Sequence, residues 1–310
     1  MCFAEAQVNG APSLALNDAV PFARPRDAAT TAGAAAGAPR CGAPVDVRLK
    51  VTNSGWIEQP PIRDMARIRF SRSTCQISGT YVPVAEMGLH DDDWVYFSHH
   101  SLLHTDTGVR LGTLPMKGGW KRMRAGMPLI MMRAQGPDHI AFSADHPGET
   151  LALPLHPGQA VDVVEHRFLV ATGNVGYDWY KPRVWFTTGS GDDEETHYPV
   201  GQTMDTFTAT NGPGLLMLHA PGNTFIRDLA PHQQILVQPG GLIWKDRTVG
   251  MFLHVEYPRG AYWFSSAKWQ AKTVWLLLRG PGRVAVQSVF ERPEGTGTVR
   301  RDSGSSTRHW

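Results

Sequence analysis

Apolar and polar residues alternate with a period of two along several short stretches of the chain. Residues 45–51 place Val and Leu between Asp, Arg and Lys, and residues 202–209 (QTMDTFTA) alternate in a similar way. This period is typical of a β-strand with one buried face. Residues 273–278 (TVWLLL) form a continuous apolar run, which predicts a strand buried on both faces. Helical spacing is nearly absent and Gly and Pro recur often, so the pattern predicts an all-β fold.

The pattern recurs three times along the chain. A Gly-Pro step leads into an apolar stretch at Gly136-Pro137, Gly212-Pro213 and Gly280-Pro281. A second block precedes each step, because residues 94–109 align without a gap on residues 234–249, and residues 161–175 align with both after one deletion. A period of this length indicates one folding unit used three times, over approximately 94–143, 161–219 and 234–288.

Turn residues occupy matching places in the three units. Asp106-Thr107-Gly108, Thr172-Gly173-Asn174 and Lys245-Asp246-Arg247-Thr248 each separate two apolar stretches. Such residues between two apolar runs predict three hairpin turns.

The composition bounds one β domain between two polar ends. The chain has 310 residues, of which 42% are hydrophobic, enough for a sizeable core. Residues 1–43 are rich in Ala, Gly, Pro and Thr and poor in aromatic residues, so we expect a disordered arm. Residues 291–310 predict a disordered tail for the same reason, which leaves residues 44–290 as a single β domain.

Charge and cysteine usage exclude several protein classes. A formal net charge of +2 gives no reason to expect a specific nucleic acid partner. Cys2, Cys41 and Cys75 are an odd number without the spacing of a metal site, so we expect a reducing compartment and no disulfide framework. No apolar run reaches about 18 residues, the length that predicts a membrane-spanning helix. The cytoplasm is the expected location, with the mitochondrion as the alternative.

Three segments carry a family resemblance. Residues 212–215 (GPGL), 235–243 (ILVQPGGLI) and 278–288 (LRGPGRVAVQS) resemble the family called altered inheritance of mitochondria, member twenty-four, also described as mitochondrial biogenesis proteins. The resemblance covers roughly residues 45–290. It implies a β-sandwich or barrel body like the tryptophan-RNA-binding attenuation protein, built from repeated sheets and assembled as a homotrimer. It also implies occurrence in bacteria and, in fungal mitochondria, a link to inner-membrane organisation, with no established enzymatic activity.

A histidine cluster is the sharpest candidate for chemistry. His99, His100 and His104 lie just after three consecutive aspartates, residues 91–93. On a regular strand His100 and His104 would lie roughly 13 Å apart, too far to share one ion at about 2 Å unless a bulge or turn intervenes. Surface histidines are therefore the favoured interpretation, and a cupin-like metal-dependent enzyme is the alternative.

A basic segment offers a second alternative. Trp120, Lys121, Arg122 and Arg124 follow two glycines but lack the phosphate-loop pattern. An aromatic residue among basic ones suits an anionic partner, either RNA or lipid.

These observations favour a non-enzymatic scaffold without a cofactor. Repeated β units leave edge strands that must be paired or covered. We therefore expect a homo-oligomer, a trimer by the resemblance, that docks a protein partner or joins a membrane-associated assembly.

Overall fold

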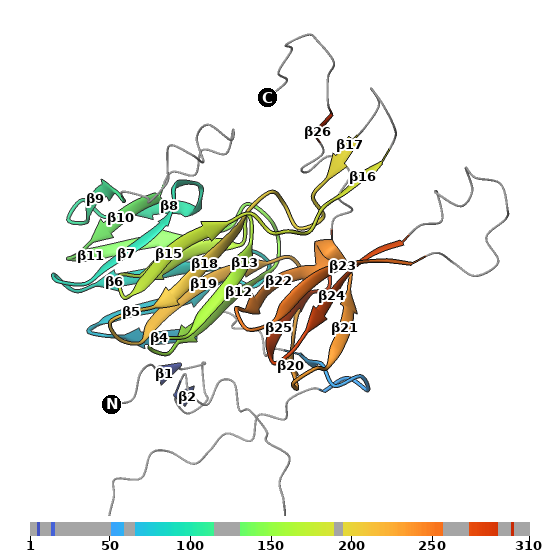
Figure 1. Cartoon of the computed structure of the whole chain (residues 1–310). Helices are drawn as coiled ribbons and strands as arrows, with labels where there is room; N and C mark the ends of the chain where they lie inside the picture. Colours follow the sequence, from blue (N-terminus) through green and yellow to red (C-terminus); the bar gives the residue numbers. More distant parts are fainter. Residues whose placement is uncertain are drawn as a thin grey trace, which may run out of the picture.

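The computed structural model describes residues 5–6, 14–15, 51–58, 66–114, 131–188, 195–256, 273–290 and 299–300 (Figure 1). Within these ranges the chain forms strands and short 3-10 turns and no α-helix, which confirms the all-β prediction. No helix in the described part is long and apolar enough to cross a membrane. The segment 45–50 lies outside the described residues, and the strand predicted over 202–209 is β18 (Met204–Ala209).

Four antiparallel sheets form the body of the molecule. Sheet 1 has the order β4 (Ala66–Phe70), β5 (Ser73–Ser78), β6 (Val84–Leu89), β11 (Asp138–Phe142), β8 (Leu102–Thr105). Sheet 2 has the order β12 (Glu149–Leu155), β19 (Gly214–Ala220), β14 (Phe168–Thr172), β7 (Trp94–Ser98), β10 (Met131–Gln135), β9 (Arg110–Thr113). Sheet 3 has the order β15 (Val175–Tyr180), β18, β13 (Ala160–Val164), β22 (Leu242–Asp246), β25 (Gly282–Gln287), β20 (Thr224–Leu229), β3 (Ile57–Glu58). Sheet 4 has the order β21 (Gln234–Val237), β24 (Thr273–Arg279), β23 (Gly250–Glu256).

Two small sheets lie outside this body. They contain β1 (Glu5–Ala6) with β2 (Leu14–Ala15), and β16 (Phe186–Thr188) with β17 (Glu195–His197) and β26 (Val299–Arg300). The arm expected over residues 1–43 and the tail expected over 291–310 otherwise lie outside the described residues.

Strands pair in the same order in three successive stretches of the chain. In the first stretch β11 lies between β6 and β8, and β10 lies between β7 and β9. In the second, β19 lies between β12 and β14, and β18 between β13 and β15; in the third, β25 lies between β20 and β22, and β24 between β21 and β23. Each stretch therefore gives three strands to one sheet and three to the next. Two pairings join successive stretches, β7 with β14 (the first junction) and β13 with β22 (the second junction).

The three predicted hairpins are wrong. The turn after β8 leads from sheet 1 to sheet 2, the turn after β14 from sheet 2 to sheet 3, and the turn after β22 from sheet 3 to sheet 4. The flanking strands alternate as hairpin strands do, but each finds its partner in another sheet. Local pattern and turn chemistry do not determine which strand is the partner.

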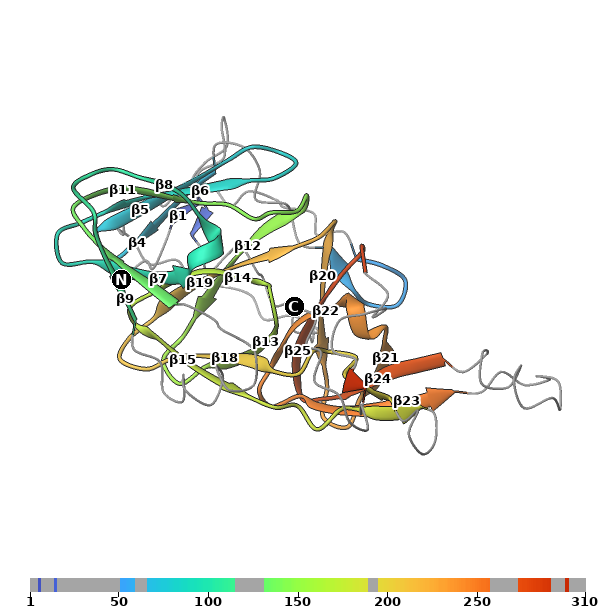
Figure 2. The same ribbon diagram turned by 90° about the horizontal axis from the view of Figure 1, so that it is seen from above.

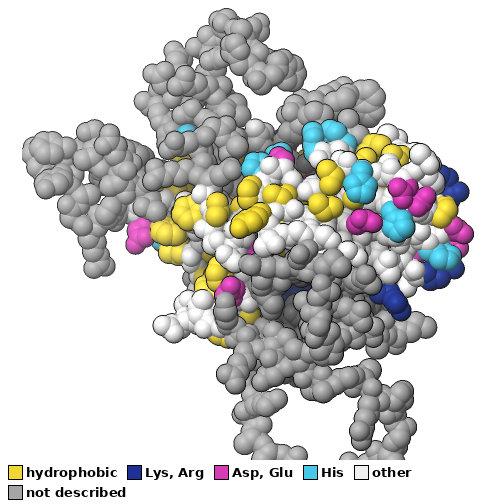
Figure 3. All heavy atoms as spheres, turned by 180° about the vertical axis from the view of Figure 1, so that it is seen from behind, with side chains coloured by type: hydrophobic (Ala, Val, Ile, Leu, Met, Phe, Trp, Pro, Cys, Tyr) yellow, Lys and Arg dark blue, Asp and Glu magenta, His cyan; other side chains and the backbone are white. Residues whose placement is uncertain are grey.

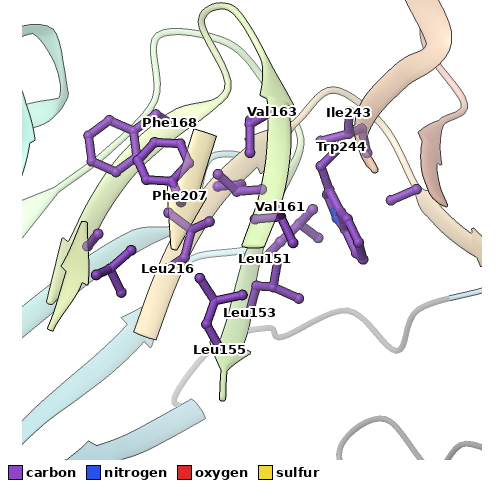
Figure 4. Close-up of a cluster of buried hydrophobic side chains, with 14 of the residues drawn as sticks. Leu151, Leu153, Leu155, Val161, Val163, Phe168, Phe207, Leu216, Ile243 and Trp244 are labelled. Atoms are coloured by element: carbon purple, nitrogen blue, oxygen red, sulfur yellow. The ribbon is translucent and has the colours of Figure 1, made fainter. Parts of the chain in front are cut away.

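The sheets follow one another as layers, with sheet 1 at one end and sheet 4 at the other (Figure 2). Successive side chains of a strand point to opposite sides of its sheet. Each inner sheet therefore contributes side chains to two cores, one on each face. Leu215 and Met217 of β19 belong to the core between sheets 1 and 2, whereas Leu216 and Leu218 belong to the core between sheets 2 and 3. Figure 4 shows this second core, where Phe168 and Leu216 meet strands of sheet 3. A third core lies between sheets 3 and 4.

Sheet 4 departs from the two-sided burial expected for residues 273–278. Leu276 and Leu278 are fully buried, but Trp275 and Leu277 are only half-buried. They point to the far face of sheet 4, on which no described sheet packs. The apolar run predicted a strand covered on both sides, and one covering layer is missing from the described chain.

Close backbone contacts explain two of the Gly-Pro steps. A Cβ atom on Gly136 would lie 2.3 Å from the carbonyl oxygen of His90, and one on Gly280 would lie 2.4 Å from that of Ala230. Both carbonyls belong to matching turns, between β6 and β7 and between β20 and β21. Only glycine allows the chain to pass so close at these crossings between sheets.

Candidate functional site

The three histidines singled out from the sequence lie on two adjacent elements. His99 and His100 form the short turn η1 (His99–Ser101) with ring centroids 3.6 Å apart, and His104 is exposed on β8. Figure 3 shows histidine and acidic side chains gathered at the end of the molecule that carries β8 and β9. Among the described residues, however, these three histidines do not form a group with ligand atoms within 4.8 Å of one another. The cupin-like hypothesis therefore finds no preformed ligand set in them.

The aspartates upstream hold a loop together. Asp93 accepts hydrogen bonds from the hydroxyl groups of Ser71, at 3.1 Å, and Ser73, at 2.5 Å. Asp92 pairs with Arg72 at 2.8 Å on the surface. These contacts join the β4–β5 turn to the start of β7, which is a structural role.

One cluster with metal-ligand side chains was missed by sequence reasoning. Asp106, Asp138 and His139 are all exposed, and their ligand atoms lie within 4.8 Å of one another. His139 Nδ1 lies 3.4 Å from Asp106 and 3.3 Å from Asp138. Asp106 belongs to a predicted turn, and Asp138 and His139 follow a Gly-Pro step. The available signal was that the turn and the Gly-Pro step both recur in each of the three units.

The third stretch shows what this cluster does. His139 and Arg283 each stand three residues after the glycine of a Gly-Pro step. Asp106, which follows β8, matches Asp246, which ends β22. Arg283 and Asp246 form a two-bond ion pair, at 3.0 and 3.1 Å. The pair of Asp106 and His139 thus corresponds to an ion pair with a structural role. Because Asp106, Asp138 and His139 are exposed, water would compete with them for a bound ion.

A pocket of about 250 Å³, with both polar and apolar side chains in its lining, lies between η1 and the end of β19. His100, His166 and His219 line it together with Ser98, Ser101, Ser143 and Asp145. His219 is 3% exposed, and its Nε2 has no hydrogen-bond partner among the residues that the structure describes. Burial first, and then the nearby charge of Arg167, lower the pKa of His219 to about 4, so this imidazole is neutral at pH 7. The pocket could accept a small polar molecule.

The basic segment of Trp120, Lys121, Arg122 and Arg124 lies outside the described residues. It belongs to the connection between β9 and β10. Its candidacy as an anionic-ligand patch stays a prediction.

The most distinctive surface consists of two open sheet edges. In the described chain β8 pairs only with β11, and β21 pairs only with β24. Their counterparts inside the molecule pair on both sides, because β14 and β22 correspond to β8, and β7 and β13 correspond to β21. An edge strand of this kind presents free N–H and C=O groups to any chain that can pair with it.

Apolar side chains mark both open edges. Leu103 of β8 is 56% exposed, whereas its counterparts Leu169 and Ile243 are 4% and 0% exposed. All three occupy the same register shift between a strand and its neighbour. Leu236 of β21 is 42% exposed, and its counterpart Tyr96 at the first junction is 1% exposed. Apolar side chains that are buried at the junctions are thus matched by exposed apolar side chains on β8 and β21.

An apolar row crosses the far face of sheet 4. Leu236 lies opposite Leu277, which lies opposite Phe252, so the three side chains share one face. Phe252 is 52% exposed. The row continues the open edge of β21 onto the uncovered side of the sheet.

The second junction contains a buried ion pair that the sequence did not reveal. Lys245 donates to Asp162 at 2.7 Å, and both side chains are almost fully buried. Asp162 also accepts hydrogen bonds from Thr206, at 2.8 Å, and Tyr180, at 3.1 Å. Partial burial, and then the nearby charge of Asp162, raise the pKa of Tyr180. A lysine directly after the apolar residues of this strand (LIWKD) was the available signal.

Comparison with solved structures supports the fold. Seven chains match, among them the crystal structure of protein SPYM3_0169 from Streptococcus pyogenes. It is 18% identical, with a TM-score of 0.53, and the match covers 71% of this chain and 94% of that one. No curated protein matches the sequence.

Comparison with protein families gives one match. The family described as Mitochondrial biogenesis AIM24 matches residues 75–289, which is well over half of the chain and spans sheets 1 to 4. The match includes the three Gly-Pro steps and both open edges. The chain therefore belongs to the AIM24 family of mitochondrial biogenesis proteins.

Proposed function

We propose that this protein is a non-enzymatic β scaffold that assembles head to tail from copies of itself. The three stretches are then copies of one unit in an array that continues from chain to chain. The observation that carries the proposal is that β8 and β21 correspond to strands that pair with each other at both internal junctions. Each chain therefore presents one strand of such a junction at each end, β8 in sheet 1 and β21 in sheet 4.

The uncovered face of sheet 4 supports the same proposal. Strand β24 is as apolar as the inner strand β19, yet no sheet of the described chain covers one of its faces. A copy added at β21 would continue the sheet and bring further layers with it. Burial of apolar surface would stabilise this contact by roughly 25 cal/mol per Å² of area removed from water, before the cost of association.

The family description supports the proposed biological role. Its description links it to mitochondrial biogenesis, and a multi-copy scaffold presents the outer surface of each unit several times to a protein partner or a membrane-associated assembly. The trimer and the cytoplasmic or mitochondrial location remain proposals on the same footing.

Light scattering on the untagged full-length protein tests the proposal, with metal analysis on the same peak. We expect a mass of at least twice 34.1 kDa, in whole multiples of it, at micromolar concentration, without stoichiometric metal. The mass of a single chain at that concentration would overturn the scaffold. One metal ion per chain would instead favour the enzymatic alternative.

A further inference from the structure

The two internal junctions share one register. At the first, Phe97 lies opposite Val170 and Tyr96 opposite Ala171. At the second, Val163 lies opposite Trp244 and Asp162 opposite Lys245. Both pairings are antiparallel.

The counterparts of these residues on β8 can be identified from the pairing itself. Ala141, Met217 and Ala285 each stand five residues after the glycine of a Gly-Pro step. They lie opposite His104, Val170 and Trp244 respectively. His104 is therefore the counterpart of the two junction residues, and Thr105 is the counterpart of the residues that follow them.

The counterparts on β21 follow in the same way. Trp94 lies opposite Gln135, the residue before one Gly-Pro step, and Gln234 lies opposite Arg279, the residue before another. Counting three residues onward makes Val237 the counterpart of Phe97. Leu236 is then the counterpart of Tyr96.

We propose that β8 of one copy adds to β21 of the next as an antiparallel strand, with Val237 opposite His104 and Leu236 opposite Thr105. This inference rests on the proposed function and names its interface. The new pairing joins sheet 4 of one chain to sheet 1 of another. The composite sheet has the strand order of sheets 2 and 3 across the joint.

The side chains at this joint suit each other. The second junction needs the pair of Asp162 and Lys245, because a lone charge there would be buried without a partner. Leu236 and Thr105 carry no charge at the matching positions, as Tyr96 and Ala171 carry none at the first junction. Docking therefore leaves no charge unpaired at this position.

The occupant is a second copy because the interface is already present twice within each chain. The same strand types, the same direction and the same register shift occur at both internal junctions. The contact is heterologous, so each added copy leaves one new β8 edge or one new β21 edge. A closed ring pairs every β8 edge with a β21 edge, whereas an open array grows with concentration.

Engineered cysteines test the register. Two double variants place cysteines at opposed positions, Leu236→Cys with Thr105→Cys, and Val237→Cys with His104→Cys, in a chain whose Cys2 and Cys41 are Ser. Adjacent opposed pairs alternate between wide and narrow Cα separations, so at least one variant has the narrow spacing that suits a disulfide. The matched control joins Leu236→Cys with Thr107→Cys, which stands two residues out of register on the other side of Thr105 and keeps Leu103 intact.

We expect mild oxidation to give covalent multimers with an in-register pair and at least tenfold less product with the control. In a closed ring the largest product has the mass found by light scattering. An oligomer that forms no in-register disulfide, or one that crosslinks equally in the control, would overturn this interface while leaving the scaffold intact. A monomer in light scattering would overturn the scaffold itself, and with it this pairing.

Discussion

The second junction and the open edges contain corresponding strands, which are paired with each other at the junction and have one neighbour each at the open edges of the described chain. At the junction β13 and β22 pair, and Ile243 and Trp244 are 0% and 1% exposed. At the open edge the counterparts of these two residues, Leu103 and His104, are both exposed. The difference lies in the neighbours rather than in the strands, because matching strands adopt matching pairings on their other side. Burial in such an array is thus a property of position within the stack.

The largest expected effect is at the ion pair of the second junction. Lys245→Met leaves the carboxylate of Asp162 buried without its cation, and we expect a loss of about 3–5 kcal/mol in the free energy of unfolding. Urea unfolding monitored by tryptophan fluorescence measures it. The matched control is Thr105→Met on the open edge, which we expect to change the stability of the separate chain by about 0.5 kcal/mol or less. Equal losses would remove the distinction between junction and edge.

Truncation of the residue at the register shift, Ile243 in β22 or Leu103 in β8, separates effects on the stability of the chain from effects on its association. Ile243→Ala removes a fully buried side chain and is expected to cost about 2–5 kcal/mol. Leu103→Ala removes its exposed counterpart and should leave unfolding of the dilute chain within about 0.5 kcal/mol. It should lower the mass seen by light scattering at a fixed concentration. An unchanged mass would mean that Leu103 is not at a contact between copies.

Acid is expected to weaken an inner sheet. His219 has its pKa lowered to about 4 by burial, against about 6.5 in an unfolded chain. Its contribution to stability is therefore present above about pH 6.5 and is lost as pH falls toward 4, by up to about 3 kcal/mol. Thermal unfolding across this range should show a steeper decline for the wild type than for His219→Gln. Parallel curves would show that His219 is not buried as a neutral imidazole.

The smallest expected effect is on the reactivity of the Cys75 thiol, at the end of the stack that carries β8. Cys75 lies in the core between sheets 1 and 2, and burial, followed by the charge of Glu86, raises the pKa of its thiol to about 12. In a chain with Cys2→Ser and Cys41→Ser we expect no reaction with a thiol reagent at pH 8 until the protein unfolds. Fast reaction in the native state would show that sheet 1 opens from sheet 2.

Sequence pattern predicted the fold class because period-two alternation depends on local geometry alone. It did not predict strand partners, since the residues around the three turns look the same whether the next strand pairs back or crosses to another sheet. The apolar run at 273–278 predicted two covered faces, whereas the described chain buries only one face of this strand.

The candidate sites show the same limit. Residues 99–104 gave a histidine motif without convergence, while Asp106 and His139 converge from blocks that are distant in sequence. Asp162 and Lys245 meet only because β13 and β22 pair. The homotrimer and the likeness to the tryptophan-RNA-binding attenuation protein stay predictions, as does the anionic patch at Trp120.

Hydrogen exchange of backbone amides, measured by mass spectrometry as a function of protein concentration, tests the central claim most directly. We expect peptides covering β8 and β21 to gain protection together, at the concentration where oligomers form. At saturation their protection should approach that of β22 and β13. Continued fast exchange of both edge strands in the oligomer would contradict the claim that these edges join the copies.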